Sequence, residues 1–141
     1  MCINEVNQNG FSEVLALIKR NGLPIEDIST STKLFSITKD SEIIGTIGIE
    51  FYNHVALLRS LAVAETYRSK GNGGKLVKHI EKFAKQNDVK ELILLTTTAS
   101  DYFIKKAYQI IERNAVPEEI KKSSEFSSTC PSSAVIMKKV L

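Results

Sequence analysis

Cysteine is scarce in this sequence. Its two cysteines, Cys2 and Cys130, lie far apart in a chain of 141 residues. Two separated thiols cannot form a disulfide framework, and neither has the second pair of ligands that a metal site requires. We therefore expect a protein of a reducing compartment, with cytoplasmic localisation and no metal.

The sequence also lacks long apolar runs and a strong charge of one sign. Its N-terminus has no basic region followed by an apolar core, and no apolar run is long enough to cross a bilayer. The formal net charge of +3 favours a phosphate-bearing ligand, but it falls short of the dense basic face that a nucleic-acid binder requires. We therefore predict no membrane partner and no nucleic-acid partner.

Length and composition favour one compact domain. Of the 141 residues, 43% are hydrophobic, which is enough to bury a substantial core. No internal repeat, linker or low-complexity segment divides the chain. We therefore expect residues 1–141 to form a single domain.

Hydrophobic periodicity predicts strands that alternate with helices. The expected strands cover residues 1–5, 34–38, 43–51, 55–63, 91–97, 109–113 and 134–140, and the expected helices cover residues 10–21, 23–28, 73–87, 99–106 and 116–122. The second to fourth strands should form an antiparallel meander. The helix over 73–87 should act as a crossover that places strand 91–97 parallel to strand 55–63. This order predicts an α/β (α+β) fold with a mixed central sheet.

A basic, glycine-rich turn separates strand 55–63 from the helix over 73–87. The cations and glycines around it are Arg68, Lys70, Gly71, Gly73, Gly74 and Lys75. Glycines let backbone N–H groups approach a bulky anion closely, and the N-terminus of a helix favours negative charge. The three cations add mobile positive charge. The turn therefore predicts a site for phosphate or diphosphate.

Two common phosphate-binding loops do not fit this turn. A Walker loop requires glycine at the position of Ser69 and serine or threonine at the position of Leu76. The dinucleotide fingerprint begins correctly at Gly71 and Gly73, but it requires glycine where Leu76 stands. Both loops are therefore excluded.

The pattern Arg68-x-x-Gly71-x-Gly73 resembles the acyl-coenzyme A signature [QR]-x-x-G-x-[GA] of the GNAT N-acetyltransferase superfamily. The order of elements resembles the GNAT fold along nearly the whole chain, which implies a mixed sheet of about six to seven strands flanked by helices. The resemblance implies acetyl-CoA as cosubstrate, bound by Leu61, Ala62, Val63, Arg68, Ser69, Lys70, Gly71, Asn72, Gly73, Gly74 and Phe103. A surface turn with solvated lysines is the alternative.

Three segments narrow the resemblance. Residues 57–63, 94–99 and 125–134 resemble the GNAT-like proteins found with arsenic-resistance operons, and the last segment is the most distinctive. This resemblance implies acetylation of a small-molecule amine, such as an amino-acid-like toxin linked to arsenic resistance. The motifs do not identify the acceptor. A monomer and a homodimer both remain open.

Acetylation of an amine requires a group that removes a proton and N–H donors for the developing oxyanion. Glu50 is a candidate base, because many GNAT enzymes place an acid late on this strand; an exposed structural carboxylate is the equal alternative. His54 is a weaker candidate, because it falls in a hairpin turn. Arg59 falls in an apolar strand, where it needs either an anionic ligand such as a substrate carboxylate or Glu50 as its partner.

The segment over residues 100–108 resembles the family pattern F-Y-x-K-x-G-[FY], in which the tyrosine often protonates the leaving thiolate. Phe103 occupies that position and cannot donate a proton, so we expect it to pack beside the coenzyme A arm. Tyr102, Tyr108 and Cys130 are other proton donors, although half-buried packing or a free thiol is favoured for each. Release of thiolate to solvent is also compatible with a thiol pKa of about 8.5.

Three functional hypotheses therefore stand. The first is an N-acetyltransferase. The second is a coenzyme A-binding module without catalysis, which the missing tyrosine favours. The third, a soft-metalloid or redox sensor that uses Cys130, is the least favoured because one thiol binds soft ions weakly.

Overall fold

The computed structural model describes residues 2–23, 25, 28, 32–121 and 134–141. Within these residues the strands form a seven-stranded sheet in the order β1-β2-β3-β4-β5-β7-β6. The strands are β1 (Cys2–Glu5), β2 (Thr32–Lys39), β3 (Glu42–Tyr52), β4 (Val55–Val63), β5 (Glu91–Thr96), β6 (Gln109–Ile111) and β7 (Val135–Val140). The helices are α1 (Phe11–Arg20), α2 (Asn72–Gln86), α3 (Ser100–Ile104) and α4 (Glu118–Lys121). This is the α/β class with the mixed sheet that the sequence predicts.

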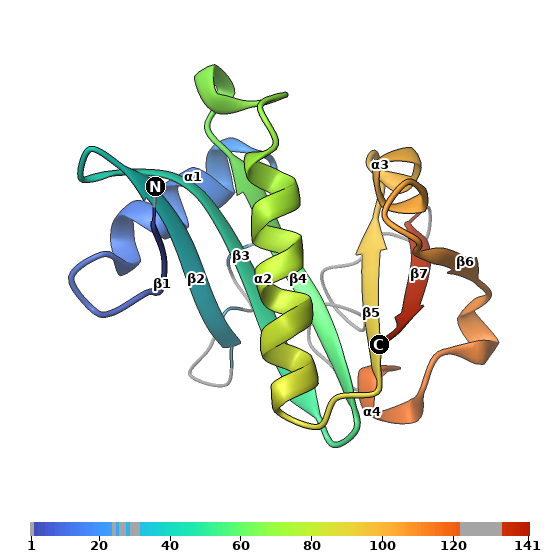
Figure 1. Ribbon diagram of the computed structural model, residues 1–141. Coiled ribbons are helices and arrows are strands. Elements are labelled where there is room, and N and C mark those ends of the chain that lie inside the picture. The colour runs from blue at the N-terminus through green and yellow to red at the C-terminus, as the bar shows by residue number, and fades with distance from the viewer. Residues whose placement is uncertain (1, 24, 26–27, 29–31, 122–133) are drawn as a thin grey trace.

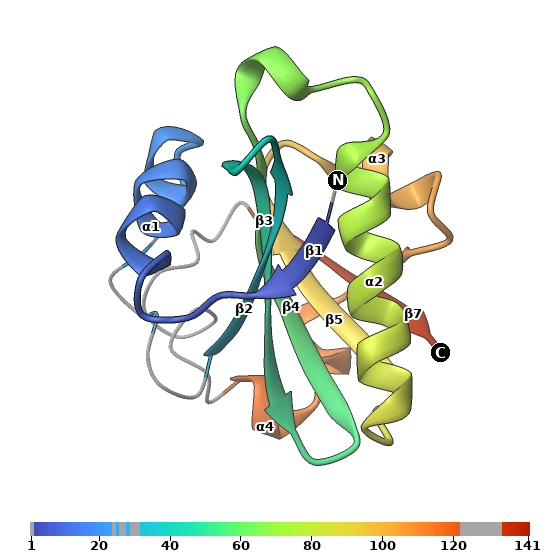
Figure 2. The same ribbon diagram turned by 60° about the vertical axis from the view of Figure 1, so that its left-hand side comes forward.

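Helices cover both faces of the sheet (Figures 1 and 2). The buried residues of α2 include Leu76, Ile80 and Ala84, which recur at helical spacing and pack against one face. Side chains alternate between the faces along a strand, so Leu57 of β4 lies in a separate apolar cluster with Ile120 of α4. Helix α1 packs on the same side of the sheet as α4, opposite α2 (Figure 2). The core therefore has two layers, one on each face.

The strand pairings confirm the predicted meander and crossover. The pairs β1–β2, β2–β3 and β3–β4 are antiparallel, whereas β4 and β5 are parallel and are joined through α2. Leu92, Ile93 and Leu94 of β5 are all buried, so both faces of this strand are covered. β7, the last strand, lies between β5 and β6 and is antiparallel to both.

Several boundaries differ from the sequence-based expectations. The strand expected over 109–113 ends at Ile111, because a short 3₁₀ helix follows over Arg113–Ala115. Helices α3 and α4 are shorter than expected. The helix expected over 23–28 falls largely outside the described residues, as does most of the segment 125–134. Within the described residues, every helix is too short or too polar to span a bilayer.

A β-bulge interrupts the pairing of β3 with β4 near the carboxyl end of β4. Thr46 pairs with Ala62 but Gly48 pairs with Arg59, so two residues of β4, Ser60 and Leu61, stand opposite one residue of β3. Ser60 has a positive φ of 59°, in the left-handed region that such bulges use.

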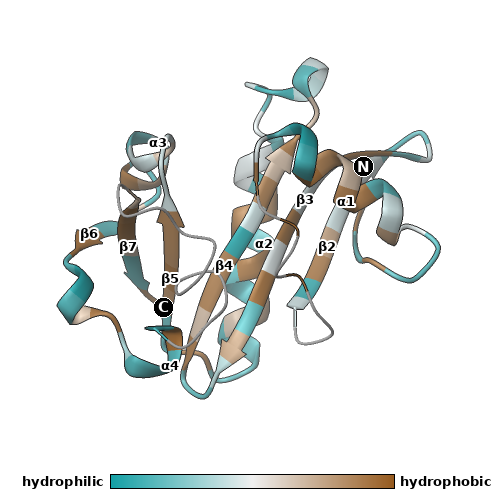
Figure 3. Cartoon of the chain, turned by 180° about the vertical axis from the view of Figure 1, so that it is seen from behind, coloured by the Kyte–Doolittle hydropathy of each residue, from teal (hydrophilic) through white to brown (hydrophobic). Residues whose placement is uncertain are grey.

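β4 diverges from β5 before it reaches this bulge. The parallel pairing of β4 with β5 ends where Leu57 pairs with Ile93, whereas β5 stays paired with β7 as far as Thr96. Figures 1 and 3 show the two strands separating toward their carboxyl ends. The hydropathy colouring in Figure 3 shows apolar residues along both diverging strands. The fold therefore opens between two largely apolar strands.

Candidate active site

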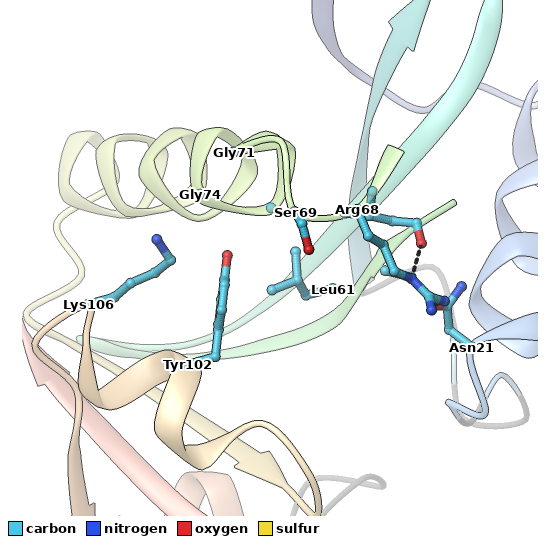
Figure 4. Close-up of a pocket in the computed structure, with 11 residues that line it drawn as sticks. Asn21, Leu61, Arg68, Ser69, Gly71, Gly74, Tyr102 and Lys106 are labelled. Carbon is cyan, nitrogen blue, oxygen red and sulfur yellow. Dashed lines mark hydrogen bonds between the residues drawn. The ribbon is translucent and has the colours of Figure 1, made fainter. Parts of the chain in front are cut away.

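The first pocket, of about 530 Å³, lies at the N-terminus of α2 (Figure 4). Its walls come from the end of β4, from the glycine-rich turn, from α3 with the residues that follow it, and from the C-cap of α1. It is lined by Asn21, Leu61, Ala62, Val63, Arg68, Ser69, Gly71, Gly73, Gly74, Tyr102 and Lys106. A strand end, a helix start and a second helix therefore meet around one cavity.

The backbone of the turn explains why α2 begins at this place. Gly71 is the N-cap of α2 and has a φ of 84°, a left-handed conformation that glycine adopts without a steric penalty. The Lys75 backbone N–H donates to the Gly71 carbonyl at 3.1 Å and closes the first helical turn. The first N–H groups of a helix have no carbonyl partner within it, and no side chain caps this one. Amide donors therefore stand at the wall of the first pocket, where an anion would be stabilised.

Arg68 is held in place by hydrogen bonds. Its Nε donates to the Val63 carbonyl at 3.0 Å, and its NH2 group donates to Asn21 Oδ1 at 2.6 Å. Asn21 is itself fixed, because its Nδ2 donates to the Leu17 carbonyl at 2.9 Å. The expectation that Arg68 supplies mobile charge is therefore wrong. Its guanidinium instead connects the glycine-rich turn to the end of α1.

Most of the residues expected to bind coenzyme A lie around the first pocket, with three exceptions. Lys70 does not line it, and its Nζ lies 5.9 Å from the ring centroid of Tyr67. Asn72 is buried and donates from Nδ2 to the Tyr67 carbonyl at 3.0 Å, so its side chain stabilises the turn. Phe103 lines a different pocket. Coenzyme contact remains a prediction for all of the expected residues.

Sequence reasoning missed that Tyr102 and Lys106 both lie in the wall of the first pocket. The Tyr102 hydroxyl lies 2.8 Å from the point that a Cβ on Gly73 would occupy, and Lys106 Nζ lies 3.1 Å from the corresponding point at Gly74. These glycines therefore leave room for the Tyr102 hydroxyl and Lys106 Nζ at the start of α2. The sequence signal was the spacing of four residues, which places two side chains on one face of the helix expected over 99–106.

The second pocket, of about 220 Å³, lies between the diverging ends of β4 and β5. It is lined by Asn21, Leu23, Leu58, Arg59, Ser60, Leu61, Leu94, Leu95, Thr96, Thr98, Ala99 and Phe103. Asn21 and Leu61 line both pockets, so the two cavities are neighbours at the bulge. Phe103 is buried there, in edge-on contact with Tyr102 and Tyr108. No phenol therefore stands at the position where the family pattern has tyrosine.

Glu50 and Arg59 form a buried ion pair beside the second pocket. Arg59 NH1 donates to Glu50 Oε2 at 2.9 Å, and the two residues are 3% and 5% exposed, respectively. Thr32 Oγ1 donates to Glu50 Oε2 at 2.6 Å, and the Tyr52 hydroxyl donates to Oε1 at 2.7 Å. The alternative that Arg59 pairs with Glu50 is confirmed, and the alternative of an exposed carboxylate at Glu50 is wrong. Arg59 lines the second pocket, whereas Glu50 lines neither pocket.

The remaining candidates lie away from the two pockets or outside the described residues. His54 is in the turn that precedes β4, at the end of that strand opposite Val63, and its Nδ1 lies 3.5 Å from the Asp88 carbonyl. Tyr108 donates to Glu81 Oε2 at 2.9 Å, and burial together with that carboxylate raises the pKa of its phenol. Cys130 lies outside the described residues. In the part of the chain that the structure describes, no group of three His, Cys, Asp or Glu residues could hold a metal ion.

Comparison with solved structures shows the same fold in proteins crystallised with coenzyme A. Rv2747 of Mycobacterium tuberculosis, in complex with CoA and NLQ, matches with a TM-score of 0.83 at 14% identity over 100% of this chain and 99% of that chain. N-acetylglutamate synthase of Neisseria gonorrhoeae, complexed with coenzyme A and L-arginine, matches with a TM-score of 0.81 at 18% identity over 99% of this chain. This chain spans only 33% of the synthase chain. At these identities the likeness establishes the fold.

Sequence comparison establishes the family. The chain is 32% identical over 113 residues to the uncharacterized N-acetyltransferase CT2212 of Chlorobaculum tepidum, and the match covers 79% of this chain and 70% of that protein. The model of the Acetyltransferase (GNAT) family matches residues 11–109, which is more than half of the sequence. The glycine-rich turn, the β4 bulge and α2 all fall inside that range. The chain therefore belongs to the Acetyltransferase (GNAT) family.

Proposed function

We propose that this protein is an acetyl-CoA-dependent N-acetyltransferase that acts on a small-molecule amine, with residues 1–141 working as one domain. The observation that carries the proposal is the junction of the two pockets at the β4 bulge. One pocket has the amide donors that a diphosphate requires, and the other is a smaller cavity with a buried arginine. Two substrates can therefore approach each other at Leu61, which lines both.

The first pocket suits the coenzyme. The N–H groups at the start of α2 would hold its diphosphate, and the carboxyl end of β4, Leu61 to Val63, would offer backbone groups to its pantetheine arm. Acetyl-CoA supplies a thioester whose C–S bond breaks as the amine nitrogen bonds to the acetyl carbon, so that the amine loses one proton and the thiolate gains one. Leu61 and Ser60, at the bulge, then border the place where the transfer occurs.

The second pocket suits the acceptor. Its wall contains Arg59, a cation that favours an acceptor with a carboxylate, and its other side chains are mainly apolar or hydroxyl-bearing. Amino-acid-like amines, including a toxin linked to arsenic resistance, are therefore the first acceptors to test. The arsenic link rests on the resemblance of residues 57–63, 94–99 and 125–134 alone.

Glu50 is the candidate for assisting deprotonation of the amine. Because three donors already hold its carboxylate and it lines neither pocket, we propose that it acts through a water molecule or through its effect on Arg59. The thiolate would leave without a phenol from position 103. Its protonation by solvent is sufficient, since a thiol pKa of about 8.5 makes thiolate a tolerable leaving group.

Release of coenzyme A thiol from acetyl-CoA, measured across a panel of amines with and without a carboxylate, tests the proposal. We expect turnover with at least one amine and a preference for those that carry a carboxylate. The second candidate function, a coenzyme A-binding module without catalysis, is favoured by the absence of a hydroxyl at Phe103. Tight coenzyme A binding without turnover on any amine would favour that module and contradict the enzyme.

A further inference from the structure

Tyr102 of α3 and Lys106, which follows the end of that helix, face the start of α2 across the first pocket. Figure 4 shows Tyr102 and Lys106 on the side of the cavity opposite Gly71 and Gly74. The hydroxyl of Tyr102 and the Nζ of Lys106 lie 2.8 Å and 3.1 Å from where Cβ atoms on Gly73 and Gly74 would stand. Both polar atoms are therefore close to the amide end of α2. We call this pair, Tyr102 and Lys106, the α3 pair.

Lys106 is the available cation of this cavity. The first pocket is lined by two cationic residues, Arg68 and Lys106, and the guanidinium of Arg68 is already bonded to Val63 and Asn21. In the part of the chain that the structure describes, Lys106 has no carboxylate partner, and its Nζ lies 4.8 Å from the ring centroid of Tyr102. A lysine ammonium has three N–H donors and binds phosphate as a compact charge. Lys106 can therefore turn toward an anion without breaking an ion pair.

Tyr102 adds a neutral donor beside that charge. Burial raises the pKa of its phenol, so the group stays protonated at neutral pH. Among the described residues no hydrogen-bond acceptor is paired with its hydroxyl, whereas Tyr108 on the far side of Phe103 is bonded to Glu81. Of these two phenols, Tyr102 is therefore the one that can donate to a ligand in the first pocket.

We propose that the α3 pair is the second half of a phosphate clamp whose first half is the N-terminus of α2. A phosphate group of the coenzyme bound beside both halves accepts hydrogen bonds from the α2 amides and from Tyr102 and Lys106. This inference rests on the proposed function and adds to it two coenzyme-binding residues that the glycine-rich motif does not contain. Lys106 also makes phosphate recognition depend on a side chain, so its loss can be compensated only by another cation.

Isothermal titration calorimetry with coenzyme A and with 3′-dephospho-coenzyme A tests the clamp. Lys106→Met should weaken binding of coenzyme A about tenfold or more, because hydrogen bonds to charged groups contribute more than neutral ones. Tyr102→Phe keeps the ring and removes the donor, so we expect a loss of about two- to tenfold. Lys105→Met is the matched control, since Lys105 carries the same charge one residue earlier, is exposed and does not line the first pocket. It should change the affinity less than about twofold.

The two ligands separate the phosphates. If Lys106→Met weakens binding of coenzyme A but not of the dephospho form, the clamp holds the 3′-phosphate. If it weakens both equally, the clamp holds the diphosphate. Unchanged affinity in a folded Lys106→Met protein, or an equal loss in Lys105→Met, would overturn the clamp while leaving the proposed function intact. A wild-type protein that binds neither ligand would overturn the proposed function itself.

Discussion

The two pockets meet at one strand but are built in different ways. The first pocket has backbone amide donors at a helix start where Gly71 has a left-handed φ, and Tyr102 and Lys106 stand beside them. The second pocket is lined by side chains, and its charged residue Arg59 is paired with a buried carboxylate. Donors of the backbone tolerate many sequences provided that the glycines remain. A site made of side chains changes its shape and charge with each substitution.

The largest expected effect lies in the side-chain site. Arg59→Met would leave the Glu50 carboxylate buried without its cation, so we expect the free energy of unfolding to fall by about 3–5 kcal/mol. Urea denaturation measures it. The matched control is Lys121→Met, which breaks the exposed pair of Lys121 with Glu118 and should cost less than about 1 kcal/mol. A loss as small as the control's would mean that the buried pair is not a structural requirement of the second pocket.

Glu50→Gln tests whether the same pair also serves the chemistry. The substitution keeps the shape of the side chain and removes its basic carboxylate, so turnover should fall by about 10²-fold while coenzyme A affinity stays the same. The loss should be greatest below the pKa of the acceptor amine, where a proton must be removed before attack. Thiol release measured from about pH 6 to about pH 9 gives the pH dependence of turnover. Wild-type turnover throughout would assign Glu50 to structure alone.

Gly73→Val tests the backbone site. A Cβ at this position would stand 2.8 Å from the Tyr102 hydroxyl and would crowd the anion that the α2 amides hold. We expect coenzyme A affinity to fall about tenfold or more, which corresponds to about 1.4 kcal/mol. Calorimetry measures the affinity, and circular dichroism shows whether the variant is folded. A folded variant with unchanged affinity would place the coenzyme elsewhere.

Phe103→Tyr should have the smallest effect on turnover. Phe103 is buried against Tyr102 and Tyr108, and an added hydroxyl without a partner costs about 1–3 kcal/mol of stability. Turnover should therefore be similar or lower. A gain of about 10²-fold, which a well-placed general acid can supply, would mean that proton donation limits the natural protein. That result would favour a weakened enzyme or a binding module.

The contrast between the pockets also explains what could be predicted from the sequence. The first to fifth strands and the glycine-rich turn have local signals, namely alternation, apolar runs and glycines before a helical period. The pairing of Glu50 with Arg59 could be stated as an alternative, because a meander brings the two strands together. The approach of Tyr102 and Lys106 to the start of α2 could not be predicted. It depends on how α3 lies against α2, a helix that is distant in the sequence. The hydrogen bond from Arg68 to Asn21 also depends on tertiary packing, because it joins the glycine-rich turn to the end of α1.

The position of β7 has a consequence for how the chain folds. β6 pairs only with β7 in the described sheet, although β7 comes later in the sequence and lies between β5 and β6. During synthesis, β2, β3 and β4 can pair through short connections as soon as each strand emerges, whereas β6 must wait for β7. Non-local pairing of this kind is slow, because the entropy of closing a loop is lost before the contacts form. Until β7 is inserted, the apolar edge of β5 is open to other chains, so this half of the sheet is where aggregation would begin.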